Sequence, residues 1–268
     1  MTRTANGSVY DETYRNYLEQ LRTRKFAGKE DVLGVAVEGE TVVVPYFAAP
    51  VRLTAGGLKD DAGRRANGSV YDETYRNYLE QLRTRKFAGK EDVLGVAVEG
   101  ETVVVPYFAA PVRLTAGGLK DDAGRRPDFS DCVVVCRYLL MCPPFEPKQK
   151  DWSAYRDFPD AGPLTVFWSD AVEKPLARTF AGRVDALRKA CDALGGVDPE
   201  MGIACDLSRR FSPLPKVPLL LVFNDAEDGF PAAASVLFEK RASTYLDAES
   251  QAILGHALSR RLIAASER

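Results

Sequence analysis

The pattern of apolar and polar residues between positions 71 and 126 predicts a helix followed by a small antiparallel sheet. The apolar residues of the helix recur three or four positions apart and therefore lie on one face. Three β-branched runs follow, interrupted by glycine and proline, and they predict a hairpin with a third strand. The closing segment AGGLKDDAGRR is expected to be a loop. The residues concerned are Tyr71, Tyr75, Tyr78, Leu79 and Leu82 in the helix, and 93–98, 102–107 and 112–115 in the strands.

This unit occurs twice, because residues 5–65 are repeated letter for letter as residues 66–126. We call them the first copy and the second copy, and residues 127–268 the body. A solenoid needs at least three units, so two units followed by an unrelated segment indicate a duplicated segment and not a repeat architecture. Complete identity leaves two explanations open, a recent duplication and an artefact of sequence assembly.

One copy is too small to bury enough apolar surface for secure stability, so it should complete the fold of the body. The second copy is the better candidate, because it leads directly into the body through Pro127. We therefore expect residues 66–268 to form one complete domain and residues 1–65 to be a surplus, peripheral copy. The first copy could take the same place through a longer connection, whose closure costs only about 0.6 kcal/mol per doubling of length.

The body contains helix and strand patterns in blocks, which predicts an α+β fold with mainly antiparallel sheet packed against helices. The run VPLLLVF is apolar throughout, so this strand should be central and covered on both faces. The segment 145–162, rich in proline and aromatic residues, is predicted to be a loop. Helices are expected over 129–142, 166–180 and 184–194 and after the cap Asp247, and strands over 205–211, 217–223 and 234–238.

Charge and hydropathy indicate which classes of partner and which cellular compartment to expect. The net charge is −2 and the arginines are dispersed, so we expect no nucleic-acid partner. No apolar run approaches the length of a membrane span and the start MTRTANGSVYDE lacks a signal-peptide core, so we expect a cytoplasmic protein without a membrane partner. Its thiols should then be reduced.

Cysteine and histidine offer little catalytic chemistry. No C-x₂-C pair exists, so the cysteines are expected to pack as small apolar residues. The only histidine, His256, is expected to face solvent, and no G-x-S-x-G or H-E-x-x-H motif occurs. The five cysteines, all in the body, are Cys132, Cys136, Cys142, Cys191 and Cys205.

Polar and aromatic residues gather in two stretches that are the candidate binding residues. One stretch follows the central strand and the next strand, where loops can bring polar groups onto a ligand. The other lies in the predicted loop and offers a cation with stacking faces for an anionic or planar ligand. The candidates are Asp225, Glu227, Asp228, Glu239, Ser243 and Tyr245 in the first stretch, and Trp152, Tyr155 and Arg156 in the second.

Parts of the body resemble a known family. The run LPKVPLLLVFNDAEDGFPAAASVLFEKRASTYLDAESQAILGHALSRRL, residues 214–262, resembles the C-terminal half of the domain-of-unknown-function family 3786. YLL at 138–140 and WSAYRDFPDAG at 152–162 resemble its middle segment, and YDETYRNYLEQL with the short strands resembles its opening, so the resemblance covers 71–262. It implies a link to redox or corrinoid metabolism in anaerobic bacteria and archaea, because some members carry an extra iron–sulfur cluster domain. This chain departs by lacking that cysteine-rich domain and by carrying the opening twice.

Three functions are compatible with these residues. The one we favour is a non-catalytic accessory protein of anaerobic metabolism that binds a small molecule or cofactor through 152–156 and 225–239. The second is an enzyme that uses Asp225 and Glu239 as acid and base, which requires the two carboxyl groups to lie within roughly 10 Å. The third is an interaction module in which the surplus copy docks on another chain, giving a homo-oligomer or swapped dimer.

Overall fold

The computed structural model describes residues 36–38, 41–46, 49–54, 57–59 and 69–267, except for 109, 203 and 228. The chain divides into two compact units, Met1–Arg76 and Asn77–Arg268. Helix α3 (Ser69–Arg83) crosses the boundary between the two units. Among the described residues, no helix is both long enough and apolar enough to cross a bilayer.

The first copy contains a four-stranded antiparallel sheet in the order β1-β2-β3-β4. Its central pair is in register at Val44 and Val51, with Pro45 opposite Pro50. Each strand neighbours the next strand of the chain, so the sheet is a simple meander. The strands are β1 (Ala36–Glu38), β2 (Thr41–Tyr46), β3 (Ala49–Thr54) and β4 (Gly57–Lys59).

The second copy forms the same meander in the order β5-β6-β7-β8. Its fourth strand lies in the segment expected to be a loop, because Leu119 is buried and the Thr115 hydroxyl closes the tight turn on the Gly118 carbonyl at 2.9 Å. The start of the expected first strand is instead a helical turn, α4 (Glu91–Leu94), which the left-handed Gly95 ends. The strands are β5 (Ala97–Glu99), β6 (Thr102–Tyr107), β7 (Ala110–Thr115) and β8 (Gly118–Lys120).

The body contains the third antiparallel sheet of the described residues, in the order β10-β11-β12-β9. The apolar strand β11 lies between β10 and β12 and is almost wholly buried, which confirms its predicted central place. The segment 145–162 is not entirely a loop, since β9 pairs with β12 through Ala154 and Leu237. The strands are β9 (Trp152–Ala154), β10 (Leu207–Leu214), β11 (Val217–Asn224) and β12 (Ala233–Glu239).

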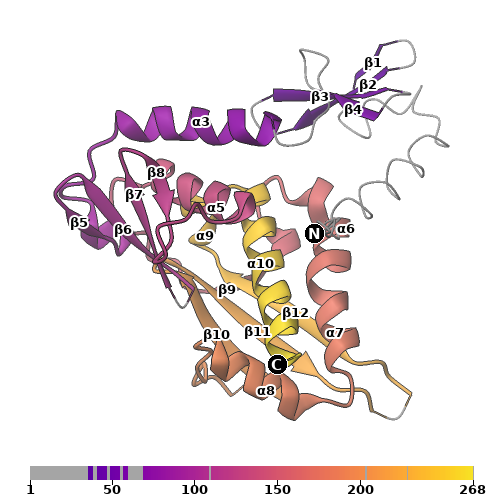
Figure 1. Ribbon diagram of the computed structural model, residues 1–268. Helices are drawn as coiled ribbons and strands as arrows, with labels where there is room; N and C mark the ends of the chain where they lie inside the picture. Colours follow the sequence, from indigo (N-terminus) through magenta and orange to yellow (C-terminus); the bar gives the residue numbers. More distant parts are fainter. Residues whose placement is uncertain are drawn as a thin grey trace, which may run out of the picture. The chain divides into compact units, whose positions relative to one another are not determined.

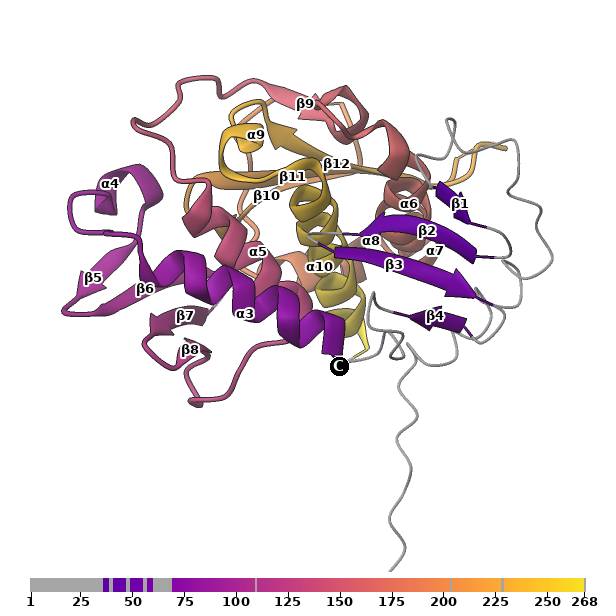
Figure 2. The same cartoon turned by 90° about the horizontal axis from the view of Figure 1, so that it is seen from above.

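Helices of the body cover one face of this sheet, which confirms the α+β class. The longest, α10, runs across the sheet and contacts α5, α7 and α8 (Figures 1 and 2). Residues 233–236 of β12 alternate between exposed and buried, whereas successive residues of the central strand β11 are buried, so both faces are covered along β11. The helices are α5 (Phe129–Leu140), the 3₁₀ turns Tyr155–Asp157 and Gly162–Leu164, α6 (Thr165–Trp168), α7 (Lys174–Phe180), α8 (Val184–Ala193), α9 (Ala242–Tyr245) and α10 (Ala248–Ser266).

Pro175 shapes the helix expected over 166–180. A π-helical turn at Ser169–Glu173 separates α6 from α7, and the proline occupies the first turn of α7. Proline is tolerated there because the first turn of a helix has no partner for its N–H, and the π turn absorbs the irregularity.

Helix α10 is fixed at its start and in its middle. The Asp247 side chain accepts the Ser250 N–H at 2.8 Å, which confirms the predicted cap. A Cβ atom placed on Gly255 would lie 2.3 Å from the Trp168 ring, so only glycine allows this indole to pack against the helix.

The second copy packs against the body through residues of α4 and of the β6–β7 turn. The Phe108 N–H donates to the Pro213 carbonyl at 2.8 Å. The Tyr245 hydroxyl donates to the Val93 carbonyl at 3.0 Å, and the Tyr138 hydroxyl donates to the next carbonyl, that of Leu94. The second copy and the body therefore share a hydrogen-bonded, buried junction.

Candidate functional site

The aromatic candidates of the 152–156 stretch are divided between core and surface. Tyr155 is buried, its ring stacks on Trp168 at 4.4 Å, and its hydroxyl donates to the Ala248 carbonyl at 2.8 Å. Trp152 lies on the edge strand β9, and Arg156 is exposed with its Nε 3.9 Å from an Asp157 oxygen. The stacking face of Tyr155 is used inside the protein, so it is not available to a ligand.

The acidic candidates after β11 serve the local backbone. The Asp225 carboxylate accepts the N–H groups of Gly182 at 2.7 Å and of Ala226 at 2.8 Å. Glu227 exchanges backbone hydrogen bonds with Phe230 and so closes the hairpin to β12. Asp228 lies outside the described residues.

Asp225 and Glu239 do not form the expected acid–base pair. In the antiparallel register Asn224 lies opposite Ala233, while Leu219 lies opposite Phe238. Asp225 therefore follows one end of the strand pair and Glu239 lies at the other, roughly 20 Å away at about 3.3 Å per residue. The sequence places both residues at strand ends, but those strands run in opposite directions.

Glu239 belongs instead to a buried ion network. Its carboxylate lies 2.5 Å from Nε of Arg241, a residue only 4% exposed. Arg241 Nη1 also contacts Glu146 at 2.5 Å, and Lys216 contacts the other Glu146 oxygen at 2.6 Å. These hydrogen bonds lower the pKa of Glu146 below its ordinary value, with Lys216 as the main cause. The network ties the 145–151 segment to the sheet.

The last two candidates also have structural roles. The Ser243 hydroxyl donates to the Lys240 carbonyl at 3.2 Å within the turn before α9. Tyr245 is buried and stacks on Tyr138 with ring centroids 5.6 Å apart. Burial raises the pKa of Tyr245 to about 12, so its hydroxyl stays protonated as a hydrogen-bond donor. The structure thus uses the pair to hold the second copy.

Cysteine and histidine positions agree only in part with expectation. Cys132, Cys136 and Cys191 are buried in helices, and burial raises the pKa of Cys191 to about 12. His256 is half-buried and not solvent-facing, because its ring packs edge-on against Phe167 with centroids 5.8 Å apart. Within the described part of the chain, no three histidine, cysteine or acidic side chains lie close enough together to hold a metal ion.

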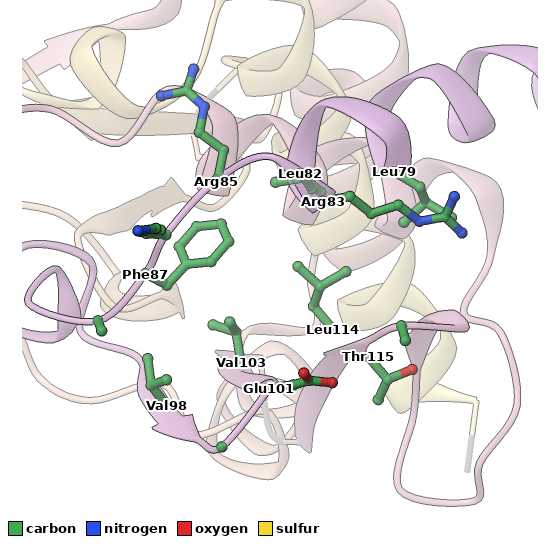
Figure 3. Close-up of a pocket in the computed structure, with 14 residues that line it drawn as sticks. Leu79, Leu82, Arg83, Arg85, Phe87, Val98, Glu101, Val103, Leu114 and Thr115 are labelled. Atoms are coloured by element: carbon green, nitrogen blue, oxygen red, sulfur yellow. The ribbon is translucent and has the colours of Figure 1, made fainter.

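A half-open cavity lies within the second copy, between the end of α3, the β5–β6 hairpin and the β7–β8 turn. Its volume is about 460 Å³. Its apolar wall combines helix, loop and strand residues around the ring of Phe87 (Figure 3). The wall consists of Leu79, Leu82, Phe87, Val98, Val103 and Leu114.

The rim of this cavity is basic. Arg83 is the last residue of α3, Arg85 and Lys86 follow it after Thr84, and all three basic residues are exposed. In the described ranges none of them forms an ion pair. The guanidinium groups of Arg83 and Arg85 point away from the apolar centre, toward its edges, in Figure 3. The one acidic lining residue, Glu101, leaves an excess of two positive charges.

A second cavity of about 580 Å³ lies beside the β6–β7 turn, but its charges are already paired. The Asp131 carboxylate accepts the Tyr107 hydroxyl at 2.7 Å and Nη2 of Arg261 at 2.7 Å. The Arg261 guanidinium also lies 4.3 Å from the centre of the Phe108 ring. A ligand there would have to displace these contacts, so the first cavity is the better candidate.

Sequence reasoning missed the first cavity, although one signal was present. The three basic residues Arg83, Arg85 and Lys86 near the end of α3 are interpreted as charges that suit the helix dipole. A phenylalanine directly after them, at Phe87, is the feature that could have indicated an apolar pocket with a basic edge. The strand residues of the wall have no distinguishing pattern, because they also face the core of the small sheet.

Comparison with known proteins assigns a family and no activity. Residues 87–261 match the sequence profile of a domain of unknown function (DUF3786). The match begins at Phe87, so it contains the strands of the second copy and nearly all of the body. No curated protein and no solved structure is detectably similar to the chain.

Proposed function

As the chain belongs to the DUF3786 family, whose description assigns no activity, we propose from its own geometry that it binds a small amphipathic anion without transforming it. The observation that carries this proposal is the apolar cavity of the second copy with its basic rim. The ligand has an apolar or aromatic body, which the wall covers, and one anionic group near the end of α3.

The size and lining of the cavity support a small organic ligand. Its volume of about 460 Å³ falls in the range of about 300–1,000 Å³ that is usual for small-molecule sites. Phe87 is 8% exposed and contributes the accessible part of its ring to the wall, where the leucines and valines exclude water from a bound apolar group. Each Å² of apolar surface buried in this way contributes roughly 25 cal/mol.

The charges of the rim support an anion. Arginine presents a planar fork that matches carboxylate, sulfonate or phosphate, and lysine adds a compact positive charge. Arg83, Arg85 and Lys86 provide three such groups against the single Glu101.

The lining supports binding without catalysis. Its only side chains with reactive oxygen are those of Glu101 and Thr115, and it contains no histidine or cysteine. The Thr115 hydroxyl donates to the Gly118 carbonyl at 2.9 Å, so its proton is held by the backbone and not by a side-chain base of the kind that activates a nucleophile.

A fluorescent probe of the same chemistry tests the proposal. Anilinonaphthalene sulfonate combines an aromatic body with one sulfonate. Arg85 and Lys86, and their identical counterparts Arg24 and Lys25 in the first copy, are changed to Glu in the full chain. Two exposed ion pairs per site contribute about 1–2 kcal/mol, so titration followed by fluorescence should show affinity weakened about five- to thirty-fold.

A matched control separates the site from total charge. Lys148, Lys150, Arg156 and Arg178 are exposed and lie outside the lining of the cavity. Changing these four to Glu alters the net charge equally and should leave the affinity within about two-fold of the unchanged chain. Equal weakening in both variants, or no saturable binding to the unchanged chain, would refute the proposal.

A further inference from the structure

Every residue by which the second copy holds the body has an identical counterpart in the first copy. In the second copy the carbonyls of Val93 and Leu94 accept tyrosine hydroxyls, and the Phe108 N–H donates to the body. The residues at the corresponding positions, 61 earlier, are Val32, Leu33 and Phe47.

The two copies also build the same sheet wherever both are described. Val44 pairs with Val51 in the first copy, and Val105 pairs with Val112 in the second. The same agreement holds for the other strand pairs, so equal sequences have produced equal strands and equal registers.

The body presents a face that requires an occupant. Tyr138 and Tyr245 are fully buried, and each donates its hydroxyl to the second copy. Pro213 accepts a third hydrogen bond, and Pro215 lies against Gly95. Removing the second copy would expose two aromatic rings to water and break three hydrogen bonds, which would destabilise the body. We call these four body residues the docking face.

We propose that the two copies are exchangeable on the docking face. In the alternative state the first copy occupies the face and the second copy loops out between the first copy and Pro127. Because the contacts made by the two copies are identical, only the connecting chain distinguishes the two states.

The length of the connection sets the ratio of the states. Eight residues, 121–128, join the last strand of the second copy to α5, which begins at Phe129. In the alternative state the last strand of the first copy, ending at Lys59, would be joined to α5 by residues 60–128. Closure probability falls as about the three-halves power of loop length, so the alternative state is disfavoured roughly 25-fold.

This ratio limits what damage to the second copy can do. A substitution that prevents the second copy from docking transfers the chain to the alternative state. The folding equilibrium constant therefore falls by no more than about 25-fold, however severe the local defect. The same substitution made in both copies has no such limit.

Gly95 is the position at which to test this limit. It has φ of +65°, and a Cβ atom there would lie 2.5 Å from Cβ of Pro215. Valine is strained in that backbone conformation and clashes with the body. The equilibrium constant for docking of the second copy should therefore fall by roughly a hundred-fold or more. Its counterpart is Gly34.

The test compares three variants of the full chain: Gly34→Val, Gly95→Val and the double variant. Urea unfolding is followed by the fluorescence of Trp152 and Trp168, both of which lie in the body. We expect the folding equilibrium constant to be unchanged in Gly34→Val and to fall by at most about 25-fold in Gly95→Val. In the double variant it should fall by a hundred-fold or more.

Each other result overturns the exchange. Equal losses for Gly95→Val and the double variant would mean that the first copy does not replace the second. A mild effect in the double variant would mean that valine is tolerated on the docking face. A loss for Gly34→Val alone would mean that the copies do not have the assigned places. Rescue of Gly95→Val that depends on protein concentration, with a dimer by light scattering, would assign the docked copy to another chain and refute exchange within one chain.

Discussion

Replacing Arg241 should destabilise the body more than any surface substitution. Arg241 is 4% exposed and is the only cation recorded in contact with the Glu239 carboxylate among the described residues. Arg241→Met keeps the length and apolar stem of the side chain but removes its charge. Glu239 then remains as an unpaired ion in the interior, while Glu146 keeps its contact with Lys216.

The magnitude follows from the burial of Glu239. Removing one partner of a buried pair costs about 3–5 kcal/mol, because the other charge has lost its compensation and cannot reach water. Replacing both partners with apolar residues is often close to neutral. Arg241→Met should therefore lower the free energy of unfolding by about 3–5 kcal/mol, and Glu239→Leu added to it should restore most of the loss. Since the network lies in the body, the first copy cannot compensate for it.

Urea unfolding monitored by circular dichroism measures this cycle directly. Arg156→Met is the matched control, because Arg156 is exposed and its nearest carboxylate oxygen is 3.9 Å away. We expect the control to change the free energy of unfolding by less than about 0.5 kcal/mol. The reasoning is refuted if Arg241→Met stays within about 1 kcal/mol of the unchanged chain, or if Glu239→Leu brings no recovery.

Two further predictions concern α10. Burial, together with the Asp247 carboxylate, raises the pKa of Glu249 from its ordinary 4.5 to about 7. The folded chain therefore holds this proton more tightly than the unfolded chain, and stability should fall as pH rises from about 4.5 to about 7, by about 1–2 kcal/mol after allowance for partial exposure. Chemical unfolding at several pH values should show a flatter profile for Glu249→Gln. Gly255→Ala should lower the free energy of unfolding by about 1–3 kcal/mol, because the added Cβ clashes with Trp168. Gly162→Ala is the control, since its Cβ would meet no atom within 4 Å and should not cause this loss. Thermal unfolding compares the two variants.

The sequence predicted those elements whose signal is local. Helix α10 has its own cap at Asp247 and a continuous apolar face, and β11 is apolar at every core position. These features lie within a few residues of the element they define, so periodicity and capping were sufficient.

The elements that the sequence missed depend on distant partners. Strand β9 exists because its three residues meet the end of β12, more than 80 positions later in the chain, as in the pairing of Ala154 with Leu237. Strand β8 is a short extension whose Leu119 side chain completes the core of the second copy. Neither segment is long enough to show a period of its own.

The candidate site was harder to predict because burial, and not residue type, decides the role of an aromatic or acidic side chain. Tyr155 and Tyr245 are suitable for stacking on a ligand, but the fold uses both in its core. Glu239 is a plausible base in sequence, yet an arginine two residues later neutralises it inside the protein. The cavity of the second copy is formed by a helix end and two turns, whose proximity only the folded sheet establishes.

The most direct test of the proposed function is to locate a bound anion. The chain is labelled uniformly with carbon-13 and nitrogen-15, and nuclear Overhauser contacts from anilinonaphthalene sulfonate are recorded. We predict contacts from the aromatic protons of the probe to Phe87, Val103 and Leu114, with its sulfonate toward Arg85. Contacts confined to the second cavity, at Tyr107 and Phe108, or to Trp152 on the edge strand would contradict the assignment of the site.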